Sequence, residues 1–218
     1  MIDFNDWEMK LKKLTDIYAK FGNNFKFNKD DSTASEQELC ELETRIQFPI
    51  PPSLRVVFLQ YSKKIEFYGW LPDKINLPDS LRKVFSACFD VSLEEVERAE
   101  KSRKGWVENC FANPDDPYDN IWHNKLGFMN VANGDVIAFD LSDEKEDKRV
   151  VYLSHDDGEG HGYILGNNFE DYFSKLLLIG ACGNEDWQML PFISDSISGI
   201  NPNCDNAKIY REIIGLFW

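Results

Sequence analysis

Residues 126–141, with the sequence LGFMNVANGDVIAFDL, constrain the fold of this chain more than any other segment. Two apolar runs flank Ala132-Asn133-Gly134-Asp135, and an Asn-Gly pair between such runs is a strong short-range signal for a hairpin. Successive side chains of a strand point to opposite faces, so runs with this spacing can pair across the turn. The segment therefore predicts an antiparallel β-hairpin.

The hairpin is predicted to continue as a four-stranded antiparallel meander, because more short apolar runs follow, separated by polar turn segments. The loops are expected at 142–148 and 154–162, and the added strands at 149–153 and 163–165. Asn168 and Asp171 then have the spacing of helix-capping residues. We expect the helix that follows, 168–177, to cover one face of the sheet.

The N-terminal half shows helical spacing instead. Apolar residues recur every three or four positions from Phe4 to Phe21, which places them on one face of a helix that ends at Gly22. Ser35 and Glu38 have the spacing of a capping box, in which each side chain binds the backbone amide of the other. Helices are predicted at 3–22, from 35 to the prolines 49, 51 and 52, from Ser53 onward, from the Ser92/Glu95 capping box to 104, and at 207–217.

The remaining segments of the N-terminal half carry weaker patterns. Polar residues 23–33 predict a loop, and the alternation at 65–71 predicts a strand. Residues 72–90 are expected to be largely irregular, and residues 113–120, NPDDPYDN, consist of turn-forming types. Together the segments predict an α+β fold, in which helices pack against a mostly antiparallel sheet. We divide the chain into an N-terminal helix and loop at 1–34, an α+β domain at 35–180 and an extension at 181–218 that packs on the same domain.

The negative charge of the chain is concentrated in one segment. The formal net charge is −14, and residues 113–171 alone hold fourteen acidic against four basic residues. Such a field repels phosphate backbones and anionic membranes and attracts basic proteins. We therefore expect a protein partner, and we expect binding to neither nucleic acid nor membranes.

The cysteines and the N-terminal sequence favour a cytoplasmic protein. Five scattered cysteines form no C-x-x-C pair, so they indicate neither a zinc site nor a disulfide framework, and reduced thiols are expected. The opening MIDFNDWEMKLKKL lacks the features of a secretory signal. No apolar run approaches the length of a transmembrane helix.

The segment HDDGEGHG, residues 155–162, is the strongest candidate for chemistry because it combines two imidazoles with three carboxylates. His155, Asp157 and His161 are ligand types that suit a divalent metal, which makes a metal-dependent hydrolase one hypothesis. The segment lies between two predicted strands, however, and its glycines predict a flexible, solvated acidic loop. We favour that second interpretation and predict no catalytic residue, no metal and no other cofactor.

Acidic and aromatic residues around the predicted meander are the candidates for binding a partner, because aromatic side chains dominate interface energetics and acidic ones attract a basic surface. Trp106, beside charged residues, is a further aromatic candidate. The predicted contact residues are Asp115, Asp116, Tyr118, Trp122, Asp156, Asp157 and Glu159.

Three passages of the sequence resemble the SUKH superfamily. The first is EQELCELETRIQFPIPPSLRVVFLQYS at 36–62, in which Leu42-Glu43, Pro49 and Phe58-Leu59 match the opening pattern of the family. The second is FMNVANGDVIAFDL at 128–141, and the third is VVYLSHDD followed by NNFEDYFSKLL at 150–177. Two departures are Tyr61-Ser62-Lys63-Lys64, where the family often has Asn-Gly, and the residues beyond 180.

This resemblance implies an α+β fold and a role in protein binding, without catalytic residues to transfer. The superfamily includes bacterial toxin-immunity proteins and fungal Smi/Knr regulators of cell-wall assembly. The leading hypothesis is an immunity-type protein that binds and blocks a basic toxin domain, such as a nuclease or a deaminase. The alternatives are a scaffold or regulator of cell-wall synthesis or signalling, and the metal-dependent hydrolase. The sequence leaves the oligomeric state open.

Overall fold

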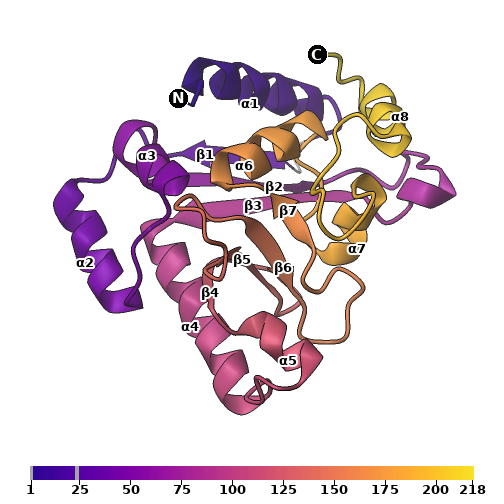
Figure 1. Cartoon of the computed structure of the whole chain (residues 1–218). Coiled ribbons are helices and arrows are strands. Elements are labelled where there is room, and N and C mark those ends of the chain that lie inside the picture. The colour runs from indigo at the N-terminus through magenta and orange to yellow at the C-terminus, as the bar shows by residue number, and fades with distance from the viewer. Residues whose placement is uncertain (1, 23–24) are drawn as a thin grey trace.

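The computed structural model describes residues 2–22 and 25–218, and it contains two antiparallel sheets with helices around them (Figure 1). The α+β fold predicted from the sequence is confirmed. Three-stranded sheet A has the order β1-β2-β3, and four-stranded sheet B has the order β4-β5-β6-β7. Every helix within the described ranges is too short or too polar to cross a lipid bilayer.

Sheet B is the predicted meander. Its strands are β4 (Lys125–Asn130), β5 (Val136–Asp140), β6 (Val150–Leu153) and β7 (Ile164–Gly166), each antiparallel to the next. Both faces of this sheet are covered. Val136 and Ala138 join a small apolar cluster with Trp122, while Ile137 and Phe139 on the other face join the main core. Burial on both faces explains why the strands are almost continuously apolar.

Helix α4 (Leu93–Asn109) covers one face of sheet B and α6 (Phe169–Leu178) lies on the other side. The contact of α4 with β4 is close: a Cβ on Gly127 would lie 2.7 Å from the carbonyl oxygen of Ala99, so only glycine fits there. Asn168 caps α6 as predicted, by accepting from the amide of Asp171.

Sheet A corrects two predictions. It consists of β1 (Phe25–Lys29), β2 (Lys64–Trp70) and β3 (Ser86–Ser92), so strands occupy parts of the predicted loop 23–33 and of the predicted irregular segment 72–90. Residues 23 and 24 of that loop lie outside the described residues. β1 is a short edge strand whose apolar residues Phe25 and Phe27 pack on the core while Lys26 is exposed. Its partner β2 is distant in sequence, so the local pattern could not show the pairing.

The first three helices are α1 (Phe4–Ala19), α2 (Glu36–Ile46) and α3 (Pro52–Gln60). The capping box of Ser35 and Glu38 is confirmed. α3 begins at Pro52 and not at Ser53. The Ser53 hydroxyl instead donates to Asp147 and accepts from the amide of Phe169, which ties α3 to α6.

The predicted capping box at α4 is only half present. Ser92 accepts from the amide of Glu95, but the Glu95 carboxylate binds the backbone and side chain of Asn130 in β4 instead of returning to Ser92. The helix also continues beyond Lys104 to Asn109. Tertiary contacts therefore decide both the cap and the length of α4.

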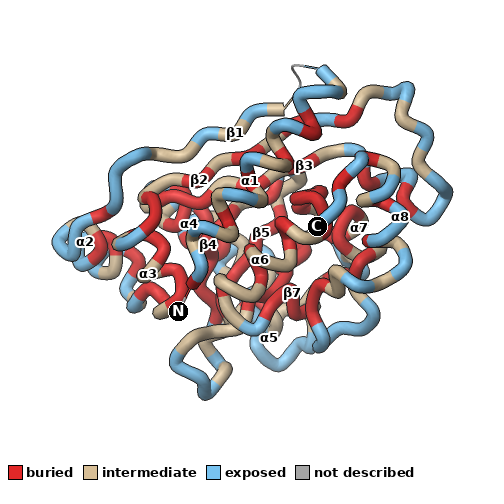
Figure 2. Tube along the Cα trace, turned by 90° about the horizontal axis from the view of Figure 1, so that it is seen from above, coloured by how far each residue is buried: buried red, intermediate tan, exposed pale blue. Residues whose placement is uncertain are grey.

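The remaining helices are α5 (Pro117–Trp122), α7 (Asp186–Met189) and α8 (Asp205–Ile214), with short 3-10 turns η1 (Asp79–Leu81) and η2 (Leu190–Phe192). Half of the predicted turn 113–120 is thus helical. The segment around α5 is largely exposed in Figure 2, where buried residues follow the strands and the inner sides of the helices. The segment after α7 borders β7: the amide of Ile164 donates to the carbonyl of Ser196 and that of Ile200 to Leu165.

Candidate protein interface

Tyr118 joins two acidic segments that are separate in the sequence. Its hydroxyl group donates to the carbonyl oxygen of Ser154 at 2.6 Å and accepts from the backbone amide of Asp157 at 3.0 Å. Its ring stacks on the imidazole of His161, with 3.9 Å between the ring centroids. α5 and the 154–162 loop are therefore held against each other by one side chain.

These contacts bring the predicted acidic residues of both segments to neighbouring positions at the molecular surface. All of them are exposed. We call this surface the acidic face, and it consists of Asp115, Asp116, Asp156, Asp157 and Glu159. Its assignment as the contact surface for a partner stays a prediction.

α5 forms because Asp116 and Pro117 suit the start of a helix. Asp116 accepts from the amides of Tyr118 and Asp119 at 2.8 and 3.2 Å, and Pro117, which lacks an amide hydrogen, occupies the first helical position. The carboxylate of Asp119 accepts from the amide of Asn113. Asp116 therefore has a structural role as well as a charge.

The acidic side chains of the 154–162 loop are exposed to solvent, as expected, but its backbone makes many hydrogen bonds that the glycines did not predict. The hydroxyl of Ser154 accepts from the amide of Gly158 and donates to the carboxylate of Asp156. Nδ1 of His161 accepts from the amide of Ser154 at 2.9 Å, which places the ring proton on Nε2, and Nε2 donates to the carbonyl of Tyr118 at 3.1 Å. Burial lowers the pKa of His161 and favours this neutral form.

Asp186, in α7, packs under the glycines of this loop. Its Oδ2 atom accepts from the amide of Gly160 at 3.1 Å, and the residue is 7% exposed. A Cβ on Gly158 would lie 2.4 Å from Asp186 Oδ2, and one on Gly160 would lie 2.6 Å from Asp186 Cβ. The glycines therefore allow a close approach of the C-terminal extension to the loop, which their spacing alone did not indicate.

Asp135, in the turn of the β4–β5 hairpin, anchors His155. The Asp135 carboxylate is 1% exposed and receives donors from the backbone and Nδ1 of His155, at 2.8 and 2.6 Å. Its other oxygen accepts from the hydroxyl of Tyr152 and the side-chain amide of Asn133, at 2.5 and 2.7 Å. Both carboxylate oxygens are thus satisfied by the protein itself.

This geometry does not assemble the triad of the hydrolase hypothesis. Within the described residues, His155, Asp157 and His161 form no group with converging ligand atoms, because His161 binds backbone groups through both ring nitrogens. Asp135, His155 and Asp156 do place ligand atoms within 4.8 Å of one another. A metal there would compete with the hydrogen bonds that hold His155 to Asp135.

The two tryptophans near the acidic face differ from the sequence expectation. Trp122 is 0% exposed, so the prediction that it contacts a partner directly is wrong. It is buried because α5 packs against α4, and its ring stacks on Phe111 with centroids 5.0 Å apart. Trp106 is half-buried: its ring stacks on His155, and its indole N–H donates to the carbonyl of Gly134.

The carboxylates of the 113–171 segment fall into two groups, those that form ion pairs with basic side chains and those that do not. Asp140 lies 3.1 Å from Lys125 Nζ, and Asp143 lies 2.7 Å from Arg149 Nε. By contrast, in the described part of the chain no basic side chain forms an ion pair with any carboxylate of the acidic face. All the carboxylates of the acidic face therefore keep a negative charge that no neighbouring basic side chain offsets.

Glu185 is a functional candidate that the sequence did not reveal. Burial raises its pKa, and so do the negative charges of Asp135, Asp186 and Asp156. Glu185 directly precedes Asp186, which binds the amide of Gly160, so the chain brings this carboxyl group close to the 154–162 loop. Because Glu185 lies in the C-terminal extension, outside the segment of concentrated charge, no local pattern could place it here.

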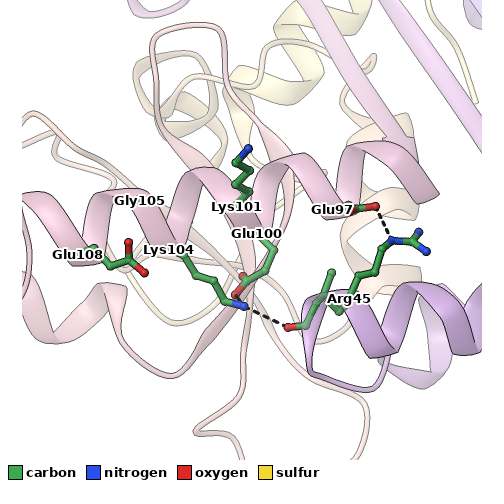
Figure 3. A pocket seen from close by; sticks show the side chains of 8 residues that line it. Arg45, Glu97, Glu100, Lys101, Lys104, Gly105 and Glu108 are labelled. Carbon is green, nitrogen blue, oxygen red and sulfur yellow. Dashed lines mark hydrogen bonds and ion pairs between the residues drawn. The ribbon is translucent and has the colours of Figure 1, made fainter.

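A groove of about 410 Å³ between α2 and α4 is the alternative surface, shown in Figure 3. Arg45 of α2 pairs with Glu97 of α4 at 2.8 Å, and Lys104 donates to the carbonyl of Ile46 at 3.3 Å. Glu100 is buried and binds Arg103 through both oxygens. Most charged groups of this groove satisfy one another, so it offers less uncompensated charge than the acidic face.

The family model that describes the SMI1 / KNR4 family (SUKH-1) matches residues 33–175, which is more than half of the chain. The matched region contains all five residues of the acidic face, whereas Asp186 and Glu185 follow it. No curated protein and no solved structure is significantly similar to the chain.

Proposed function

Because the chain belongs to the SMI1 / KNR4 family, we propose that it is a protein-binding module that neutralises a toxin domain by direct binding. The acidic face is the proposed contact surface. Toxin-immunity proteins are among the members of the wider superfamily, and the role needs no catalytic group in this chain. The predicted location of the module is the cytoplasm.

The main support for this proposal is that carboxylates without ion-pair partners extend from a loop whose backbone is held by hydrogen bonds. Tyr118 and Asp186 hold the 154–162 loop in place, so binding a partner need not order it. Exposed unpaired acids also attract a basic surface over a distance and accelerate association. Rigid, uncompensated negative charge suits a partner with a complementary basic site.

The proposed partner is a toxin whose active site binds a polyanion, such as a nuclease or a nucleic-acid deaminase. Such sites are lined with lysine and arginine, because they must contact a phosphate backbone. A face of closely spaced carboxylates can occupy them in place of the substrate. The same charge disfavours direct binding of this chain to nucleic acid.

Co-expression with a toxin encoded beside this chain tests the proposal. We expect rescue of growth and co-purification of a stable complex. The matched variants are D115N/D157N/E159Q, which removes three charges of the acidic face, and D16N/D31N/D73N, which removes three exposed charges elsewhere. Asp116 and Asp156 are left unchanged because they bind α5 and Ser154.

The acidic-face variant should lose protection at low expression, and the control variant should keep it. Equal protection by both variants would move the interface to another surface. No binding or protection by the wild-type chain against neighbouring toxins would contradict the immunity role itself.

The family assignment also favours a second candidate, a scaffold or regulator like the fungal Smi/Knr proteins. Affinity purification from the native cells separates the two roles. A stable complex with enzymes of cell-wall synthesis or signalling supports regulation, whereas a complex with one secreted toxin supports immunity.

A further inference from the structure

A row of aromatic side chains reaches the surface next to the acidic face. They come from α4, from the segment between α4 and α5, from α5 itself and from the 154–162 loop; α5 lies beside the C-terminal end of α4 (Figure 1). All of them are partly exposed to solvent. We call this row the aromatic strip, and it consists of Trp106, Phe111, Tyr118, His155 and His161.

The rings of the aromatic strip contact one another from one end to the other. His155 stacks on Trp106 with 4.8 Å between the ring centroids, and Trp106 lies 5.9 Å from Phe111. Phe111 lies 5.6 Å from Tyr118, which stacks on His161 at 3.9 Å. The strip is therefore one continuous surface, although its residues come from separate parts of the sequence.

The small apolar cluster of sheet B supports the strip from the inside. Trp122 is fully buried and stacks on Phe111, with 5.0 Å between the centroids and 10° between the ring planes. Among the described residues no other ring lies parallel to Phe111, so its exposed part faces away from Trp122. The indole N–H of Trp106 is fixed by the carbonyl of Gly134. A partner would thus meet rings that are already ordered, which lowers the entropic cost of binding.

The two segments that carry most of the strip contain no lysine and no arginine. Residues 105–124 hold four acidic residues, and residues 154–163 hold three. The carboxylates lie close to the rings in the chain: Asp156 and Asp157 directly follow His155, and Asp116 is two residues before Tyr118. The strip is therefore bordered by carboxylates of the acidic face.

The basic residues nearest to these segments are bound to other groups. Arg103 is buried and binds Glu100 through two nitrogens, and Lys125 lies 3.1 Å from Asp140. The groove toward α2 is bordered by the lysines of this part of α4, Lys101 and Lys104. The aromatic strip thus combines ring surface with negative charge that no neighbouring lysine or arginine offsets.

The two imidazoles of the strip do not reverse this charge. Burial lowers the pKa of His161, so its ring is neutral at neutral pH. His155 binds the buried carboxylate of Asp135 through Nδ1, and a proton on this ring would be balanced by that carboxylate.

Arginine is the side chain that best fits rings bordered by carboxylates. Its guanidinium group is planar and weakly hydrated, so it can stack on an aromatic ring while its N–H groups bind a carboxylate. The ammonium group of lysine is compact and strongly hydrated, and it gains less from a ring. An aliphatic side chain would cover the rings but leave the carboxylates without a donor.

We propose that the aromatic strip stacks arginine side chains of a protein partner, while carboxylates of the acidic face bind the guanidinium groups. The inference rests on the proposed function in taking the ligand to be part of a protein, and it deepens that function by naming the side chain. Aromatic residues near the centre of an interface often dominate its binding energy, with charged residues around them. The acidic face then accelerates association, and the strip slows dissociation.

The test compares three peptides of equal length: acetyl-triarginine-amide, acetyl-trilysine-amide and the neutral acetyl-tricitrulline-amide. Binding to the full chain at low salt is followed by NMR chemical shifts of the backbone amides and tryptophan indoles. We expect the arginine peptide to bind about two- to fivefold more tightly than the lysine peptide, which is the size of one cation–π contact at an exposed site. The largest shifts should fall on the aromatic strip, and the citrulline peptide should bind much more weakly than either.

F111L should remove the preference for arginine, because it removes a ring but keeps an apolar cover over Trp122. F111Y keeps a ring and should retain the preference. F48L is the matched control, because Phe48 is also partly buried but packs on the main core. D115N/D157N/E159Q should weaken both cationic peptides and leave the preference for arginine in place. Thermal unfolding checks that each variant is folded.

Three results would overturn the inference. These are the absence of saturable binding by the arginine peptide, equal affinities of the arginine and lysine peptides for the wild type, and a preference for arginine that survives F111L. Binding of the citrulline peptide as tight as that of the arginine peptide would also contradict it, because the strip would then bind apolar surface without regard to charge.

The outcome is separable from the proposed function. A preference for arginine that depends on Phe111 supports the strip even when no toxin binds the chain. Protection against a toxin by wild type and F111L alike, with equal affinities for the arginine and lysine peptides, would contradict the strip and leave the acidic face as the interface.

Discussion

At the scale of single residues, side chains that look like surface groups in the sequence organise the candidate interface. Tyr118 was predicted only as a partner contact, yet its hydroxyl group links Ser154 and Asp157. Asp135 belongs to a hairpin turn and also orients His155. Neither role is visible in the sequence, because both depend on contacts between separate segments.

Tyr118→Phe tests the link between α5 and the loop. The variant keeps the ring that stacks on His161 but loses both hydrogen bonds of the hydroxyl group. We expect the free energy of unfolding to fall by about 1 kcal/mol. Amide hydrogen exchange of residues 155–161 should accelerate. The control is Tyr163→Phe, because Tyr163 is half-buried and its hydroxyl forms no hydrogen bond among the described residues. Equal effects of the two variants would contradict the role of Tyr118.

Asp90 predicts a measurable dependence of stability on pH. Burial, together with the negative charges of Glu95 and Glu66, raises the pKa of Asp90 from its ordinary 3.8 to about 6 in the folded protein, against smaller opposing effects of Lys64 and Arg98. Between pH 3.8 and about 6, Asp90 keeps its proton in the folded state but has lost it in the unfolded chain. The contribution of Asp90 to the free energy of unfolding therefore falls as the pH rises through this range. Above about pH 7 Asp90 is ionised in both the folded and the unfolded state, and its full destabilising effect on the folded state is reached.

D90N should therefore be more stable than the wild type by about 1 kcal/mol or more near neutral pH, since one pKa unit corresponds to about 1.4 kcal/mol. The difference should shrink as the pH falls to about 4. Urea unfolding at several pH values measures it, with D31N as an exposed control. A D90N variant that is less stable at neutral pH would contradict the picture of an unsatisfied carboxylate.

At the scale of elements, local patterns predicted those helices and strands whose caps and turns are encoded nearby. The Ser35 capping box, the Asn133-Gly134 hairpin and the Asn168 cap are all present. β1 and β3 were missed because short strands in sheet A depend on partners that are distant in sequence. Trp122 was misplaced for a related reason: the packing of α5 on α4 buries it.

The different surroundings of Gly160 and Gly105 predict opposite effects when each is replaced by alanine. Gly160→Ala places a Cβ 2.6 Å from Asp186 Cβ and should destabilise the fold by about 1–3 kcal/mol. Gly105→Ala, within α4, meets nothing within 4 Å and should stabilise it by up to about 1 kcal/mol. Thermal unfolding of both variants measures the difference. A neutral Gly160→Ala would show that the extension does not fix the loop.

At the scale of the whole molecule, the two sheets differ in how far their faces are covered by other elements. Sheet B is enclosed by apolar clusters on both faces and provides a rigid frame, whereas the outer face of sheet A carries polar and aromatic residues such as Glu66, Tyr68 and Trp70. The fold class and the concentration of charge followed from the sequence. The separation of that charge into paired and unpaired carboxylates did not, because it depends on which lysine and arginine side chains reach them.

The rate of association between this chain and a basic toxin encoded beside it tests the central claim most directly. The claim is that unpaired carboxylates of the acidic face attract the partner. We predict that D115N/D157N/E159Q slows association several-fold at low salt, that D16N/D31N/D73N has a much smaller effect, and that added salt reduces the difference. Equal association rates for the two triple variants at low salt would contradict the account.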